Sequence, residues 1–156
     1  MQHLQSSELL QPSLFDAVLI PTLALPDPLA EIPLIDASET FSELALRGTL
    51  THCLHLLAPV LRELSQAVDA RWLTLIAPPS PLNQHWLREA RLNRERILLL
   101  QARSEQSALQ LACEVLRLGR SHTVISWLQP LAPQDCRQLA NAARQGGAQS
   151  LNIRLD

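Results

Sequence analysis

The chain has 156 residues, enough for one domain with a buried core, and 47% of them are apolar. Its three cysteines form no CxxC pair, which argues against a disulfide framework or a zinc site, and the absence of 18 consecutive apolar residues and of a signal peptide predicts a soluble, cytoplasmic protein. The net charge of −2 is unevenly divided, because residues 1–46 hold seven acids and no base, while all 13 basic residues, every one an arginine, lie further on.

The N-terminal part contains five of the eleven prolines and shows no sustained hydrophobic period. We therefore predict an acidic, mostly disordered tail over residues 1–43, with at most a short strand near Ile32–Ile35, and a single domain over residues 44–156. From Leu50 to Val68, leucines recur at intervals of three and four, which predicts an amphipathic helix. Pro59 is expected to kink this helix or to begin a second one.

The rest of the chain alternates between apolar runs and amphipathic segments. The apolar runs predict strands over residues 71–77, 96–101, 122–128 and 150–155. The other segments predict a helix over 84–90 capped by Asn83, a helix from Ser104 to Leu118 ending at Gly119, and a helix over 133–145 ending at Gly146 and Gly147. This alternation predicts an α/β fold with a mostly parallel sheet that helices cover on both faces.

The junction after the first long strand carries Pro78, Pro79 and Pro81 and no glycine. The chain contains neither GxxxxGK[ST] nor GxGxxG, so we expect no ATP hydrolysis and no cofactor. His52 and His55 lie one helical turn apart, but no further ligand completes a metal site, so we interpret them as partly exposed helix residues. No GxSxG elbow is present either, and we expect that the protein is not an enzyme.

Arginine and tryptophan concentrate in one window, residues 71–103, with six arginines and two acids. Trp86 lies on the short predicted helix, close in sequence to four arginines: Arg88, Arg91, Arg94 and Arg96. Exposed tryptophan beside arginine is typical of interface hot spots, although Trp86 could equally cover the edge of the sheet. Trp72 opens a predicted strand, and Trp127 is expected to close another in the core.

A short peptide in the tail, QPSLF, resembles the motif by which bacterial proteins dock on the replication sliding clamp. Its contact residues would be Gln11, Leu14 and Phe15. Five residues in a tail are also compatible with an incidental apolar patch.

The stretches ARWLTLIAPPSPLNQHWLREARLNRERILLLQ and ALQLACEVLRLGRSHTVISWL resemble the SulA family of SOS-induced bacterial cell-division inhibitors. The shared features are an Arg-Trp strand start, a proline turn, a tryptophan helix, a basic and aliphatic strand, and a closing G-x-x-x-x-V-I-x-W-L. The resemblance covers roughly residues 44–155. It implies a RecA-like fold that has lost its ATP site and works as a protein-binding surface.

The partner that the resemblance implies is the tubulin-like GTPase FtsZ. Members of the family bind the FtsZ face whose loop completes the neighbouring subunit's GTPase site, and so block polymerisation and the GTP hydrolysis that depends on it. By position, the family's functionally important residues fall on Arg71, Ile76, Trp86 and Arg96. The other arginines of the same window, Arg88, Arg91 and Arg94, are our candidates for rim contacts. The residues themselves allow a structural role in place of partner contact at two of these positions. Arg71 could order the strand start, and Ile76 could belong to the core.

Three further expectations concern partners. Relatives carry a C-terminal, His-containing tail that the Lon protease recognises, whereas this chain stops at Asp156, so rapid Lon turnover is in doubt or depends on the N-terminal tail. The oligomeric state stays open, a homodimer included. The alternative function is a RecA-like accessory of translesion DNA synthesis that binds the sliding clamp or DNA, although few aromatics are present to stack on single strands.

Overall fold

A computed structural model describes residues 40–156, whose five strands pair into one fully parallel sheet in the order β1-β5-β4-β2-β3. The strands are β1 (Phe41–Leu46), β2 (Trp72–Ile76), β3 (Ile97–Leu100), β4 (Ser121–Ser126) and β5 (Gln149–Leu155). Every residue of the central strand β4 is buried, as expected for a parallel strand covered on both faces. The edge strands β1 and β3 also carry exposed residues, three in β1 and one in β3.

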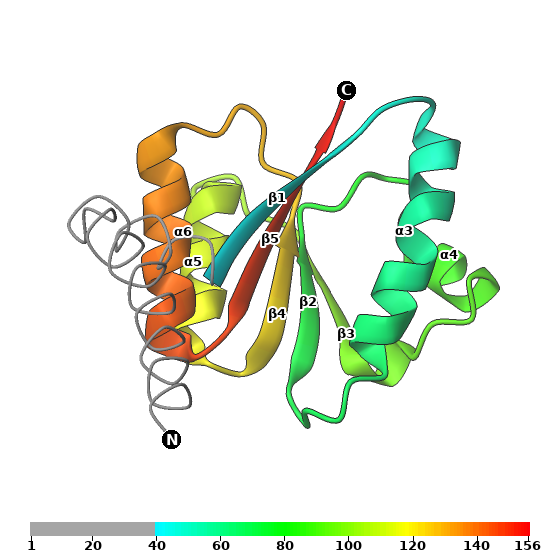
Figure 1. The fold of residues 1–156 in the computed structure, drawn as a ribbon, viewed down its shortest axis with the longest axis horizontal. Helices are drawn as coiled ribbons and strands as arrows, with labels where there is room; N and C mark the ends of the chain where they lie inside the picture. Colours follow the sequence, from blue (N-terminus) through cyan, green and yellow to red (C-terminus); the bar gives the residue numbers. More distant parts are fainter. Residues whose placement is uncertain (1–39) are drawn as a thin grey trace, which may run out of the picture. The chain divides into compact units, whose positions relative to one another are not determined.

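Helices cover both faces of this sheet (Figure 1). Helices α3 (Leu50–Ser65) and α4 (Gln84–Glu89) lie on one side, and α5 (Ala108–Leu118) and α6 (Pro133–Gly146) lie on the other. A short 3-10 turn, η1 (Arg94–Arg96), leads into β3. The predicted α/β class, with a parallel sheet and helices on both faces, is confirmed. None of the helices within residues 40–156 is long and apolar enough to cross a membrane.

The alternation of side chains along β2 divides the interior into two cores. Leu73 and Leu75 point toward α3 and α4, where they join Leu57 and Leu61. Ile76 points to the opposite face and packs in the cluster formed with α5 and α6. Since β2 is buried on both faces, its apolar run is continuous, which is why the sequence shows it so clearly.

The ends of two helices differ from the predicted ones. Helix α3 contains Pro59 within one continuous helix, so Pro59 does not begin a second helix. Helix α5 begins at Ala108, not at Ser104, because Ser107 caps it and forms a reciprocal capping box with Gln110. Its end was predicted correctly, with Gly119 in the left-handed conformation at φ 68°.

Strand β1 was not predicted, and the predicted boundary at residue 44 falls inside it. The strand pairs with β5 along its whole length, from Phe41 opposite Ser150 to Leu46 opposite Leu155. Because β1 lies at an edge and three of its six residues are exposed, FSELAL carries only a weak apolar signal. Residues 1–39 of the expected tail, including the strand expected near Ile32–Ile35, lie outside the described residues.

Other strand ends shift by one or two residues. Strand β4 ends at Ser126, so the prediction of a strand through Leu128 was wrong. Trp127 follows the strand, half-buried against the cluster on the α3 side, and its buried indole N–H has no hydrogen-bond partner within residues 40–156. Arg96 belongs to η1 and not to β3.

Candidate functional site

The strand-to-helix junction at Ala77–Leu82 occupies the place where open α/β sheets usually bind ligands. Neighbouring strands β2 and β4 are followed by helices on opposite faces, and in open α/β sheets ligands bind at the carboxyl ends of such a strand pair. Here the Ala77 N–H donates to the Leu100 carbonyl at 2.9 Å, and three prolines contribute no N–H. The junction therefore offers few of the free backbone amides that hold a phosphate.

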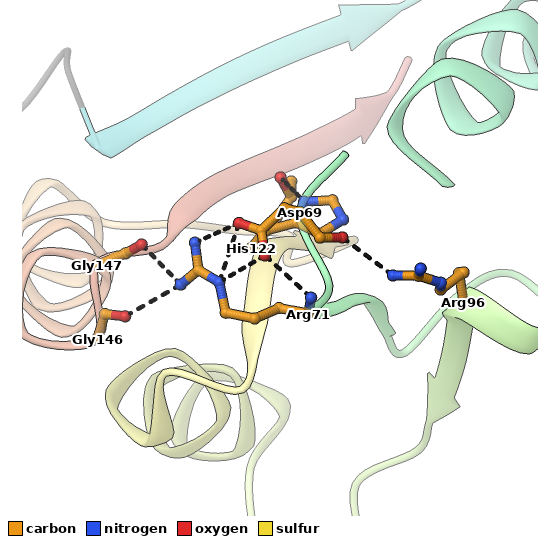
Figure 2. Close-up of polar contacts among 7 residues, drawn as sticks. Asp69, Arg71, Arg96, His122, Gly146 and Gly147 are labelled. Atoms are coloured by element: carbon orange, nitrogen blue, oxygen red, sulfur yellow. Dashed lines mark hydrogen bonds and ion pairs between the residues drawn. The ribbon is translucent and has the colours of Figure 1, made fainter. Parts of the chain in front are cut away.

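A different group of charged residues gathers at the opposite end of the strands, around Asp69 in the loop before β2 (Figure 2). The Arg71 guanidinium donates to both carboxylate oxygens of Asp69, with Nη2 at 2.7 Å from Oδ2 and Nε at 3.1 Å from Oδ1. The Arg71 backbone N–H also donates to Oδ1 at 2.9 Å. This bidentate geometry fixes the loop at the point where β2 begins.

Arg71 also connects this loop to the end of α6. Its Nη1 donates to the Gly147 carbonyl at 2.9 Å and lies 3.5 Å from the Gly146 carbonyl. Cations are favourable at a helix C-terminus, where backbone carbonyls lack partners within the helix. Because most of its donors are occupied inside the domain, the geometry favours the structural role considered for Arg71, ordering the strand start.

Arg96 approaches Asp69 from the other side, as Figure 2 shows. Its Nη1 donates to the Asp69 backbone carbonyl at 3.0 Å. Within residues 40–156 its guanidinium makes no other hydrogen bond, and the side chain is half-exposed. Arg96 therefore keeps donors for a partner. The structure thus brings Arg71 and Arg96 together on Asp69, which sequence reasoning did not select.

The electrostatics of this cluster follow from its hydrogen bonds and burial. The side-chain and backbone hydrogen bonds from Arg71 lower the pKa of Asp69 to about 2, against a smaller opposing effect of burial. Burial lowers the pKa of His122 below its usual range, and the nearby Asp69 opposes that shift only in part. The His122 ring is held by Nδ1 at 2.9 Å from the Thr123 hydroxyl. Asp69 is therefore ionised and His122 neutral at pH 7.

Trp86 lies elsewhere, in a groove of about 460 Å³ between α3 and α4. The ring is half-buried and packs against the core on that side. Asn83 caps α4 by accepting from the Trp86 N–H at 3.1 Å, and Arg62 holds the other end by donating to the Ala90 carbonyl at 2.7 Å. Neither Arg71 nor Arg96 lines this groove. The structure therefore does not unite Trp86 with the Asp69 cluster.

The remaining candidates divide clearly by exposure. Arg88, Arg91 and Arg94 are exposed, and their side chains form no hydrogen bond or ion pair within the described part of the chain. Ile76 has 0% exposure, so it cannot itself touch a partner, and its assignment to the core is confirmed. Gln11, Leu14 and Phe15 lie outside the described residues.

The histidines considered for metal binding are exposed on α3, as expected for His52 and His55. Among residues 40–156, no three side chains of His, Cys, Asp or Glu converge on a position that could hold a metal ion. The three cysteines, Cys53, Cys113 and Cys136, are free thiols. Burial is the main reason that the pKa of the Cys113 thiol is raised.

Taken with the fold, these features define a class: a five-stranded parallel α/β domain whose usual phosphate-binding junction is closed by prolines. Residues 40–150 match the family model described as cell division inhibitor SulA. The chain belongs to the SulA family of cell division inhibitors. The match extends over most of the described domain.

Individual relatives agree with this assignment. The cell division inhibitor SulA of Pseudomonas aeruginosa is 64% identical over 121 residues, covering 78% of this chain and 75% of that protein. The SulA of Photorhabdus laumondii is 30% identical over 93 residues, covering 60% of this chain and 51% of that protein. The SulA of Yersinia pestis is 29% identical over 99 residues, with 64% of this chain and 58% of that protein covered.

A solved structure shows the same architecture. The crystal structure of SulA from Pseudomonas aeruginosa superposes with a TM-score of 0.71 at 66% sequence identity. The match covers 74% of this chain and 98% of the crystallised one. In contrast, this chain spans only about half of the Photorhabdus relative.

Proposed function

We propose that this protein is a cytoplasmic inhibitor that binds FtsZ near one-to-one during the SOS response, blocking polymerisation and the GTP hydrolysis that requires assembly. The observation that carries the proposal is the match of residues 40–150 to cell division inhibitors. The partner FtsZ comes from the resemblance of the Arg-Trp strand, the tryptophan helix and the closing strand to that family.

The structure of the junction supports binding rather than catalysis. The Ala77 N–H is already used by Leu100, and Pro78, Pro79 and Pro81 have none to offer. A nucleotide phosphate would find few free amides there and no lysine, since the chain contains none. We therefore propose a protein that works by occupying a surface of its partner, with no chemical step of its own.

Arg96 is the residue that we propose as the main charged contact. Its unused donors can pair with a carboxylate of FtsZ, while Arg71 holds the loop and Asp69 in position. Arg88, Arg91 and Arg94 would then lie at the rim, where ion pairs contribute little. Reversing the charge at Arg96 should cost about 2–5 kcal/mol of binding, which is a loss of affinity of about 30-fold or more.

The test is a titration of FtsZ and GTP with this protein through one equivalent, following sedimentable polymer and GTP hydrolysis. We expect both to fall near equivalence with the wild type and with Arg137→Asp, an exposed arginine on α6. Arg96→Asp should leave both unchanged at the same concentration. Unaffected assembly with the wild type would refute FtsZ inhibition. Full inhibition at about a hundredth of the FtsZ concentration would refute sequestration, because a sequestering ligand acts by mass action.

A further inference from the structure

Exposed apolar side chains gather at the end of the sheet where the strands begin. Within residues 40–156, seven large apolar residues are exposed. Three of them lie on α3, and the other four are Val68 (102%), Trp72 (42%), Leu98 (39%) and Leu118 (68%). Surface residues of this size are unremarkable singly, but a group of them at one place marks an interaction site.

The topology places these four residues at the end of the sheet where the strands begin. Val68 lies in the loop that leads into β2, and Trp72 is the first residue of that strand. The Trp72 N–H donates at 3.0 Å to the carbonyl of Arg120, two residues after Leu118, the last residue of α5. Leu98 is paired with Thr74, so Trp72 and Leu98 share one face of neighbouring strands. We call Val68, Trp72, Leu98 and Leu118 the strand-start patch.

Positive charge surrounds the strand-start patch. Arg117 and Arg120 are exposed, and their side chains form no hydrogen bond or ion pair within the described part of the chain. Arg96 lies two residues before Leu98 and keeps unused donors. The carboxylate of Asp69 is already paired with Arg71. Two exposed acids lie near these three arginines, Glu95 in η1 and Glu114 one helical turn before Leu118, so positive charge is in excess. The charge of the patch therefore complements an apolar segment that carries carboxylates.

Trp72 has the properties of an anchor that Trp86 lacks. Trp86 is seated in the α3–α4 groove against the core, whereas Trp72 is 42% exposed and shares a sheet face with Leu98, two residues after Arg96. Tryptophan and arginine are enriched among the few residues that supply most of the binding energy at protein interfaces.

We propose that the strand-start patch is the surface on which an acidic, apolar segment of FtsZ docks, with Trp72 as its anchor and Arg96, Arg117 and Arg120 around it. This inference rests on the proposed function and adds the surface and the central residue. Trp86 then acts by holding α4 in place and makes no contact with the partner.

The test compares Trp72→Ala with Leu56→Ala, a residue on α3 that is exposed to a similar degree (49%) but lies on the other face of the sheet. Binding to FtsZ is measured by calorimetry, folding by thermal unfolding, and self-association by sedimentation velocity. A second variant, Arg120→Glu, probes charge without removing apolar surface. We expect Trp72→Ala to weaken binding at least about 30-fold, equivalent to about 2 kcal/mol, and Arg120→Glu to weaken it most at low salt. Leu56→Ala should bind like the wild type.

The outcomes separate this inference from the proposed function. Wild-type affinity in a folded Trp72→Ala variant would overturn the strand-start patch and leave FtsZ inhibition standing. Unchanged FtsZ binding combined with the conversion of a dimer to a monomer would assign the patch to a second copy of the chain instead. Failure of the wild type to bind FtsZ would overturn both.

Discussion

Gly146→Ala tests whether the close approach of α6 to the end of α5 holds the domain together. A methyl group at Gly146 would overlap the Leu116 backbone carbonyl oxygen, and it would lie 2.8 Å from the carbonyl carbon and 3.2 Å from the Gly119 nitrogen. These atoms are backbone, so no side chain can rotate away. The two helices must separate, which loosens the packing of Leu116 against Ala143 in the second core.

Overpacking of this kind costs about 3 kcal/mol, the upper end of the usual range, because the neighbour that must move is a helix. For a chain of 156 residues that is a fall in Tm of about 6–12 °C. Gly147→Ala is the matched control, since nothing lies within 4 Å of its added methyl group, although its φ of +59° is strained. It should cost about 1–2 kcal/mol. Urea midpoints for both variants measure the difference, and a Gly146→Ala protein as stable as Gly147→Ala would refute the argument.

Three further predictions follow from burial and ionisation. In Asp69→Asn we expect lower stability at pH 7 and a smaller loss of stability between pH 4 and 2. The pKa of Asp69 is about 2 in the folded protein against an ordinary 3.8. The ionised carboxylate therefore stabilises the fold above pH 3.8, and this stabilisation is lost as the pH falls toward 2. Identical urea midpoints across that range would contradict this. In the wild type, stability should fall as the pH drops below 6.5, because the pKa of His122 is lowered in the folded protein and the unfolded chain binds the proton more readily. The stability of His122→Gln should lack this decline between pH 7.5 and 5.5. Ile76→Ala should cost about 2–5 kcal/mol of folding, yet the protein that remains folded at low temperature should inhibit FtsZ fully; weak inhibition by folded protein would mean that Ile76 has a role beyond the core.

Much of the fold could be predicted because burial of a helix or strand imposes a regular spacing of apolar residues on the sequence. The leucine spacing of α3 and the unbroken apolar run of β2 are direct results of burial on one face and on two. Strand β1 escaped prediction because an edge strand needs few apolar residues, and Glu43 interrupts the pattern. The start of α5 was misplaced because Ser104 and Ser107 are both chemically suitable caps, and only the geometry of Gln110 decides between them.

The candidate site was predictable by residue type and not by arrangement. The arginine-rich window pointed to Arg71 and Arg96, but their common partner Asp69 is one acid among many in the sequence. The sequence favoured Trp86 over Trp72 as the interface tryptophan, and it could not show that Trp72 is the more exposed of the two, since exposure depends on where α5 ends and how α4 packs on α3. Leu98 and Leu118 look like ordinary core leucines until the sheet order places β3 at an edge.

The pairing of β1 with β5 also determines the order in which the domain can be completed during synthesis. Phe41 is translated early, but its pairing partner Ser150 is translated only after strands β2, β3 and β4. Strands β2, β3 and β4 can pair in the meantime, whereas β1 must wait with its backbone unpaired, and such non-local pairing is slow to form. The β1–β5 pair of the sheet therefore forms only after β5 has been translated, and a cell that needs this domain quickly must wait for all five strands.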